Sequence, residues 1–311
     1  MHYTLHQLKI FTYVVKYQSI TKASEELFLT QPAVSIQLKK LQDQFDIPLT
    51  EVIGRQLFVT EFGREIAEVA NRILDESSKI NSMVDQFKGF LSGKITVSVV
   101  STGKYVMPYF LNKFLKDHPK VEISMNVTNR SAVLESLTNN ETDFALVSVP
   151  PEDLKVNQIE LMENRLQLVC NSDLYKELPD RKLTKKDIEK LPLIFREQGS
   201  ATRRAMEDYL NSHDIHPKPR LELMSNEAVK QAVNAGLGFS IMPLIGLRHE
   251  LLSGEMKIVS AKDLPVVTEW TLIYLKGKKL SPAAHAFEDY VNQHKDDVIE
   301  KYFTWTEQDF H

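Results

Sequence analysis

The stretch SITKASEELFLTQPAVSIQLKKLQ, Ser19–Gln42, contains a proline near the middle of an otherwise helical pattern. Proline is tolerated in the first turn of a helix, where its missing N–H would have no partner anyway. Pro32 therefore predicts that a second helix begins here, with Thr30 as its N-cap. Two short helices joined by a tight turn predict a helix-turn-helix.

The apolar residues of the second helix recur with helical spacing. Val34, Leu38, Leu41 and Phe45 fall on one stripe, which predicts that this side of the helix faces a small core. Residues 5–15 have similar spacing and predict a third helix around the same core.

The outward face of the second helix carries groups suited to DNA. Gln31 and Ser35 lie near its N-terminus, where amides and hydroxyls reach base edges in the major groove. Outward Ile36 suits a thymine methyl, and Lys39 and Lys40 suit phosphate. The alternative is an ordinary solvated face, because Gln, Ser and Lys are common there. The candidate DNA-contacting residues are Thr30, Gln31, Pro32, Ser35, Ile36, Lys39, Lys40 and Arg55.

Arg55 belongs to the segment that follows. Leu49–Ile53 and Gln56–Thr60 are rich in residues typical of strands, and Gly54-Arg55 between them predicts a hairpin turn. A hairpin after a helix-turn-helix would act as a wing whose tip lies on the DNA backbone, so Arg55 would contact phosphate.

A helix with a heptad-like apolar seam follows the wing. Ile66, Ile73, Ile80 and Phe87 recur every seven residues, a pattern typical of a helix that pairs with a second copy of itself. A dimer suits DNA recognition, because one recognition helix contacts too few bases to be selective. The chain is therefore expected to form a homodimer or homotetramer.

Composition and charge limit the classes of function. The 311 residues carry a net charge of −4, and residues 1–64 hold seven Lys or Arg against six Asp or Glu, so any DNA binding depends on where the charges lie. The single Cys170 excludes an internal disulfide and a cysteine-cluster zinc site, and the histidines lack metal-ligand spacing. We expect a soluble cytoplasmic protein, because no apolar run is long enough to span a bilayer and no signal sequence is present. We also expect no metal or cofactor.

The first ninety residues resemble a known family. The run LHQLKIFTYVVKYQSITKASEELFLTQPAVSIQLKKLQDQFDIPL, with GRQLFVTEFG behind it, is similar to the N-terminal module of LysR-type transcriptional regulators. The match departs from the family pattern at Ile36, where a polar residue or arginine is usual. Thr50 and Val52 also stand in a segment that usually reads Leu-Phe-Glu-Arg. Both departures lower the number of expected phosphate contacts.

After Gly93, short β-rich runs such as KITVSVV and DFALVSV alternate with helical stretches, which indicates an α/β domain with a largely parallel sheet. A second set of strands and helices predicts a second lobe with a cleft between the two. The resemblance continues here and implies a two-lobed, periplasmic-binding-protein-like effector domain behind a winged helix-turn-helix. The expected boundaries are 1–62 for DNA binding, 63–92 for the linker and dimerisation helix, and 93–311 for the effector domain. Lobe I would be about 93–164 with 268–295, and lobe II about 165–267.

Polar residues follow several of the predicted strands, at the carboxyl ends where ligands of open α/β sheets bind. Hydroxyls, guanidiniums and helix N-termini around one cleft suit a small anion, such as a carboxylate, phosphate or sulfate. The alternative is helix capping, the commonest role for Ser, Thr and Asn at such positions. Arg196 favours the anion, because capping does not need it. The candidate effector-binding residues are Ser101, Thr102, Thr128, Asn129, Arg130, Ser148, Arg196, Ser200 and Thr202.

REQGSATR and TNRSAVLESL are most similar to the CbbR-like carbon-metabolism branch of the family, whose effectors tend to be phosphorylated or acidic metabolites. Ala201 replaces a glycine of that branch's usual Gly-Ser-Gly-Thr-Arg, which leaves less room for the backbone to approach a ligand. A sulfur-metabolism regulator that binds an anion is therefore an alternative.

The resulting interpretation is a regulator, not an enzyme, that binds dyad-symmetric promoter DNA as an oligomer and responds to a small anionic metabolite. RNA polymerase is a further candidate partner. The competing hypothesis is a two-lobed binding protein or enzyme whose N-terminal helices serve only for assembly. Residues 296–311 contain Tyr302, Phe303 and Trp305 and could dock on the body or on a partner; the sequence favours neither.

Overall fold

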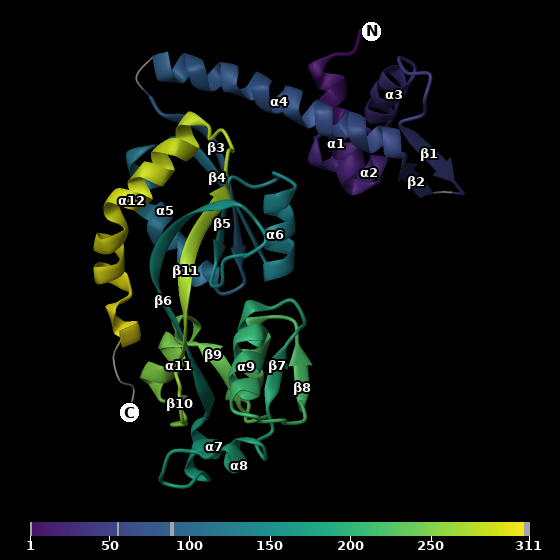
Figure 1. Ribbon diagram of the computed structural model, residues 1–311. Coiled ribbons are helices and arrows are strands. Elements are labelled where there is room, and N and C mark those ends of the chain that lie inside the picture. Colours follow the sequence, from purple (N-terminus) through teal and green to yellow (C-terminus); the bar gives the residue numbers. More distant parts are fainter. Residues whose placement is uncertain (1, 55, 88–89, 308–311) are drawn as a thin grey trace. The chain divides into compact units, whose positions relative to one another are not determined.

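Helices and one β-hairpin form the N-terminal unit, Met1–Gly93 (Figure 1). The computed structural model describes residues 2–54, 56–87 and 90–307, and for residues 78, 79 and 81–87 it describes the backbone alone. The elements of this unit are α1 (Leu5–Tyr17), α2 (Ile20–Glu26), α3 (Gln31–Gln42), β1 (Thr50–Ile53), β2 (Gln56–Val59) and α4 (Glu61–Phe87).

Side-chain capping explains why α2 and α3 begin where they do. Ser19 accepts a hydrogen bond from Lys22 N at 3.3 Å, and Thr30 accepts one from Ala33 N at 3.4 Å. Pro32 lies in the first turn of α3, where no intrahelical bond is lost. Phe28 makes the turn between the helices with φ 54°. The predicted helix pair is confirmed, together with the start of its second helix.

The predicted apolar stripe forms the core of this unit. Val34, Leu38 and Leu41 of α3 are buried against Phe11 of α1 and against other apolar residues of the same cluster. The stripe gains stability by removing apolar area from water, and it leaves the opposite face of α3 exposed.

The heptad-like seam of α4 begins inside this core. Ile66 and Ile73 pack against the buried cluster of the N-terminal unit, while Ile80 is 62% exposed. The side chain of Phe87 lies outside the described residues. The first two seam positions therefore pack within the chain, because an apolar repeat indicates a buried stripe without naming what covers it. Pairing of α4 with a second copy stays a prediction for the part after Ile73.

The predicted wing is present as the β1–β2 hairpin. Thr50 pairs with Val59 and Ile53 with Gln56, and Gly54 has φ 66°, which glycine adopts without strain. Arg55, predicted at the tip of the wing, lies outside the described residues.

The second unit, Lys94–His311, has two lobes joined by two long strands, β6 (Val156–Asn171) and β11 (Val266–Leu275). Lobe I contains β3 (Ser92–Val100), η1 (Gly103–Tyr105), α5 (Met107–Asp117), β4 (Lys120–Thr128), α6 (Arg130–Thr138), β5 (Phe144–Val147) and α12 (Pro282–Tyr302). Lobe II contains α7 (Ser172–Lys176), α8 (Lys185–Ile188), β7 (Ile194–Arg196), α9 (Ala201–Ser212), β8 (Leu221–Leu223), α10 (Asn226–Asn234), β9 (Ser240–Pro243), η2 (Leu244–Gly246), α11 (Arg248–Ser253) and β10 (Met256–Ile258). The short helix η3 (Thr304–Glu307) follows α12.

The main sheet has the strand order β10-β6-β11-β5-β3-β4, and β9 also pairs with β6. β3 and β5 are parallel, whereas β11 is antiparallel to both β5 and β6. The chain leaves lobe I along β6 and returns along β11, so these neighbours run in opposite directions. The expectation of a largely parallel sheet is therefore wrong for this sheet, which is mixed, while the α/β class is confirmed.

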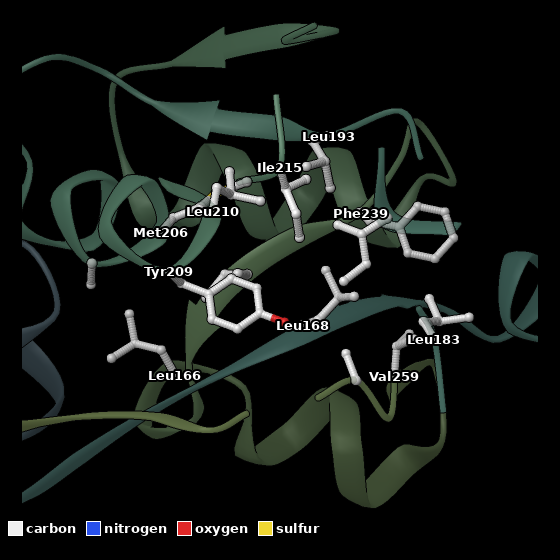
Figure 2. Packing of buried hydrophobic residues seen from close by; sticks show 14 of the residues in the cluster. Leu166, Leu168, Leu183, Leu193, Met206, Tyr209, Leu210, Ile215, Phe239 and Val259 are labelled. Atoms are coloured by element: carbon white, nitrogen blue, oxygen red, sulfur yellow. The ribbon is translucent and has the colours of Figure 1, made fainter. Parts of the chain in front are cut away.

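The core of lobe II holds β7 and α9 in place beside the cleft. Figure 2 shows Leu166 and Leu168 of β6 packed with Phe239 and with Met206 and Tyr209 of α9. This cluster buries one face of α9, so the position of its N-terminus relative to the sheet is set by packing. Cys170 belongs to this cluster as a small core residue, and burial raises the pKa of its thiol to about 12.

The C-terminal segment docks on the body of the second unit. α12 continues to Tyr302, and Phe303 and Trp305 after it are buried. The Phe303 ring lies 5.1 Å from that of Tyr109 in α5, and the Arg248 guanidinium of lobe II lies 5.3 Å from the Trp305 ring. The alternative that the sequence left open is resolved for residues up to 307 in favour of docking on the body. None of the helices in the described part of the chain is both long and apolar enough to span a membrane.

Candidate functional sites

The exposed face of α3 presents the predicted DNA-contacting groups to solvent. Gln31, Ser35, Lys39 and Lys40 are exposed, and Ile36 is 54% exposed. Thr30 and Pro32 are exposed too, but their visible role is to start the helix, through the cap and the first turn. The face therefore has the order that major-groove binding needs, with an amide and a hydroxyl near the N-terminus and two cations further along.

This surface is apolar where a basic wing would be expected. Val52 and Ile53 of β1 are 69% and 63% exposed, and Phe28 in the turn before α3 is 96% exposed. Neither Phe28 nor Ile53 was singled out from the sequence, although a large apolar residue in a turn or at a hairpin tip is a recognisable signal. The low local charge noted in the sequence is thus matched by apolar side chains on the same unit.

In the second unit, the predicted effector residues lie at strand ends and helix starts. Ser101 and Thr102 follow β3, Thr128 ends β4, and Ser148 follows β5. Arg196 is the last residue of β7. Thr102, Ser148, Ser200, Thr202 and Arg196 are all buried, with between 3% and 8% of their surface exposed.

Two of these residues meet across the lobes. Arg196 of lobe II donates through Nη1 to Ser101 Oγ of lobe I at 3.1 Å. The same oxygen accepts from Asn226 Nδ2, at the start of α10, at 3.0 Å. A second contact between the lobes joins the Tyr105 hydroxyl to Glu227 Oε2 at 2.9 Å, and burial together with Glu227 raises the pKa of Tyr105. The ends of β3, β7 and α10 therefore meet at one polar centre, around Ser101.

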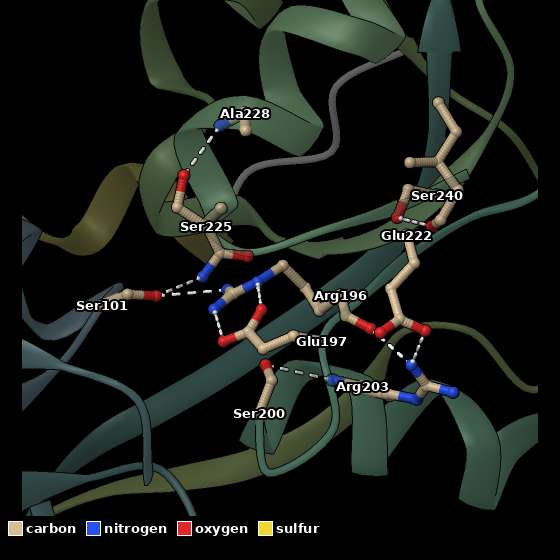
Figure 3. A network of polar contacts seen from close by, with 11 residues as sticks. Ser101, Arg196, Glu197, Ser200, Arg203, Glu222, Ser225, Ala228 and Ser240 are labelled. Carbon is tan, nitrogen blue, oxygen red and sulfur yellow. Dashed lines mark hydrogen bonds and ion pairs between the residues drawn. The ribbon is translucent and has the colours of Figure 1, made fainter. Parts of the chain in front are cut away.

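Arg196 has a partner that the sequence interpretation did not include. Its Nε and Nη2 donate to Glu197 Oε2 and Oε1 at 2.7 and 2.8 Å, in a bidentate pair with Glu197 7% exposed (Figure 3). Glu197 and Asn226 are thus parts of the centre that sequence reasoning missed. Glu197 is adjacent to Arg196, and an acid next to a predicted anion-binding arginine was a usable signal.

Helix capping accounts for some of the predicted effector residues. Asn129 accepts from Ala132 N at 3.0 Å and Ser200 accepts from Arg203 N at 3.4 Å, so both side chains cap the helices that follow them. The first turn of α6 and the residue before the N-cap of α9 nevertheless approach each other, since a methyl group on Gly199 would lie 2.7 Å from Ser131 Oγ. The capping interpretation is therefore correct for Asn129 and Ser200, and both lie where the lobes meet.

Two other arginines near the cleft, Arg203 and Arg130, differ in how many contacts their guanidinium groups make within the protein. Arg203 is anchored, because it contacts Glu207 at 2.7 Å, Glu222 at 2.6 Å and the carbonyl of Arg196 at 2.8 Å. Arg130 donates to the Val149 carbonyl at 3.2 Å, and burial followed by the nearby Arg204 lowers its pKa. Arg204 is thus a second cation close to Arg130, while the carboxylates of Glu152 and Asp153 act on Arg130 in the opposite direction.

A separate cavity of about 390 Å³ opens beside the docked C-terminal segment. Its lining includes Lys104, Tyr109, Lys230, Arg248 and Trp305, and it does not include the predicted effector residues in the described part of the chain. Where the cleft is predicted, Ser101 accepts hydrogen bonds directly from Arg196 and Asn226. Among the residues that the structure describes, no group of three or more His, Cys, Asp or Glu could hold a metal ion.

Comparison with known proteins assigns both units. A family model described as the LysR substrate binding domain matches residues 88–296, and one described as the bacterial regulatory helix-turn-helix protein, lysR family, matches residues 5–64. The HTH-type transcriptional activator CmpR of Synechocystis sp. (strain ATCC 27184 / PCC 6803 / Kazusa) is 35% identical over 295 residues, 95% of this chain and 97% of that protein. The HTH-type transcriptional regulator CbbR of Rhodospirillum rubrum is 36% identical over 282 residues, 91% of this chain and 93% of that protein.

A solved structure of the Synechocystis PCC6803 CcmR regulatory domain in complex with 2-PG is also similar. It superposes with a TM-score of 0.60 at 30% identity and covers 68% of this chain and 98% of that one. The relatives named here are transcriptional regulators, in agreement with the non-enzymatic interpretation, and they confirm the predicted CbbR-like branch. The chain therefore belongs to the LysR family of bacterial transcriptional regulators.

Proposed function

We propose that this regulator binds dyad-symmetric promoter DNA as an oligomer through α3, and that a small phosphorylated metabolite in the cleft between its lobes controls it. The observation that carries the effector half is the polar centre at Ser101, where the two lobes contact each other through Arg196 and Asn226. A ligand there would touch both lobes and would shift the equilibrium between their arrangements. The similarity to the CcmR domain, whose solved structure contains 2-PG, supports a phosphorylated ligand.

The DNA half is supported by the division of α3 into a buried and an exposed face. Val34 and Leu38 are buried in the core and fix the orientation of the helix, so Gln31 and Ser35 are held on its exposed face. Exposed Ile80 on α4 supports assembly with a second copy, which would place two recognition helices on one dyad. The proposal places the protein in the cytoplasm with the promoter; a contact with RNA polymerase stays a prediction.

Removing either base-reading group should relax sequence discrimination. We expect Gln31→Ala or Ser35→Ala to cost about 1–3 kcal/mol on the cognate site and less on a mutated site, because each loses a contact to a base edge. The measurement is a gel-shift titration of both sites at one fixed salt concentration. Lys39→Ala and Lys40→Ala are the contrast, since loss of a phosphate contact weakens binding to every sequence alike. Unchanged discrimination in the Gln31 and Ser35 variants would remove them as readers.

The effector proposal is tested on the full chain with 2-PG. A ligand at 100 times its dissociation constant should stabilise the protein by about 2.7 kcal/mol, which raises the midpoint of thermal unfolding. The same concentration should change the mobility or salt sensitivity of the promoter complex in a gel shift. Thr102→Ala should weaken this response while leaving DNA affinity nearly intact. No response to 2-PG, other phosphorylated sugars or acids, or sulfate would contradict a small anionic effector.

A further inference from the structure

The cation predicted to hold the effector is already neutralised within the protein. Arg196 and Glu197 form two parallel hydrogen bonds, and the side chains of the pair are only 3% and 9% exposed. Figure 3 shows the Glu197 carboxylate against the guanidinium, with Ser101 on the other side of it. A bidentate carboxylate is the geometry in which arginine also binds carboxylate and phosphate ligands. Glu197 therefore occupies the positions that two oxygens of an anionic ligand would take.

The pair lies at the contact between the lobes and not in a separate part of the fold. Nη1 of Arg196 reaches Ser101 Oγ, which also accepts from Asn226. Asn226 is only 4% exposed, and its Oδ1 atom is buried and has no hydrogen-bond partner among the described residues. A buried polar atom without a partner is costly, so this acceptor is open to a donor group, such as a hydroxyl, of a ligand bound at this centre.

We propose that the Glu197 carboxylate is an internal counter-ion, which the anionic group of the effector displaces from Arg196. This inference rests on the proposed function and adds that the site selects effectors by the number of negative charges they carry. A single carboxylate would replace one anion by another and leave Glu197 without its partner, so it has no advantage. A dianionic phosphate, or a molecule with two acidic groups, can bind Arg196 and also interact with the helix N-termini nearby. The effector class is therefore a polyvalent anion.

The experiment removes the charge of Glu197 and measures binding of a simple anion to the full-length protein. In Glu197→Gln, we expect inorganic phosphate to bind at least about tenfold more tightly than in the wild type, because a like charge beside the anion has gone. Isothermal titration at constant ionic strength gives both dissociation constants. Glu207→Gln is the matched control: it removes the same charge from the same lobe, but its carboxylate pairs with Arg203. We expect its phosphate affinity to stay within twofold of the wild type.

Three outcomes decide the proposal. A gain in Glu197→Gln that disappears in the double variant Arg196→Met/Glu197→Gln supports displacement at Arg196. Equal phosphate affinity in Glu197→Gln and the wild type overturns it, whatever the natural effector is. A gain that persists without Arg196 also overturns it, because the anion would then bind elsewhere.

A second variant covers the case in which Glu197→Gln does not fold. Glu197→Asp keeps the charge but shortens the side chain by one methylene, so both oxygens cannot reach the guanidinium as they do now. We expect a smaller gain in phosphate affinity, about threefold, in proportion to the weaker pairing. No gain in a folded Glu197→Asp protein would count against the proposal. Failure of the proposed function looks different: 2-PG would then bind neither protein nor change DNA binding, while the phosphate comparison would still give its own answer.

Discussion

Arg196→Ala should lower the free energy of unfolding of the second unit by about 3–5 kcal/mol, because it leaves the buried Glu197 carboxylate without a counter-ion. Ser101 would lose its Arg196 donor at the same time, so one contact between the lobes goes as well. The two tryptophans of the chain, Trp270 and Trp305, both lie in this unit. Urea unfolding followed by tryptophan fluorescence therefore reports on the affected unit alone.

Arg203→Ala is the matched control for this prediction. It also removes a guanidinium, in the first turn of α9. The carboxylates that Arg203 contacts are on Glu207 and Glu222, whose side chains are 38% and 51% exposed. Water can solvate these acids after the change, so the loss of stability should be clearly smaller than for Arg196→Ala. If both variants lost the same stability, burial of Glu197 would not be the cause. Arg196→Ala should also abolish the response to 2-PG, since the proposed anion partner is gone.

Phe303→Ala should also cost about 3–5 kcal/mol in the stability of the second unit, the usual range for a buried phenylalanine. Phe303 is 3% exposed, and its ring lies 5.1 Å from that of Tyr109 and 6.4 Å from that of Phe110. The substitution leaves a cavity between α12 and α5 that the helices can only partly close. The measurement is the midpoint and slope of urea unfolding, followed by circular dichroism because Trp305 lies close to the changed residue.

Thr304→Ala is the control for the C-terminal segment. Thr304 is exposed and next to Phe303, so its truncation should change stability by less than about 0.5 kcal/mol. A Phe303→Ala protein as stable as the wild type would show that the segment does not dock on α5 in solution.

The parts of the fold that the sequence predicted are those decided by neighbours in the chain. α3 begins at Gln31 because Thr30, Pro32 and the amide of Ala33 lie within four residues, and such short-range capping can be read directly. The wing turn at Gly54 is local in the same sense. By contrast, β6 is one strand of sixteen residues, although only its last part, Leu166–Cys170, is a short β-rich run in the sequence. Its first nine residues include Glu160, Glu163 and Asn164, and pairing with β11 holds this part extended in spite of them.

The candidate cleft shows the same division between local and long-range structure. Ser101 and Arg196 could be recognised as polar residues at strand ends, because their position depends on the local pattern of strands and helices. Their mutual contact joins residues 95 positions apart and exists only when the two lobes pack on β6 and β11. Whether Glu197 turns towards Arg196 or towards water depends on that packing too, since burial makes an unpaired charge costly. The sequence alone determined the family and the helix-turn-helix, and it predicted Ser101 and Arg196 as polar residues of the cleft. The tertiary structure decided which of them are paired, because desolvation and long-range contacts appear only when the chain is folded.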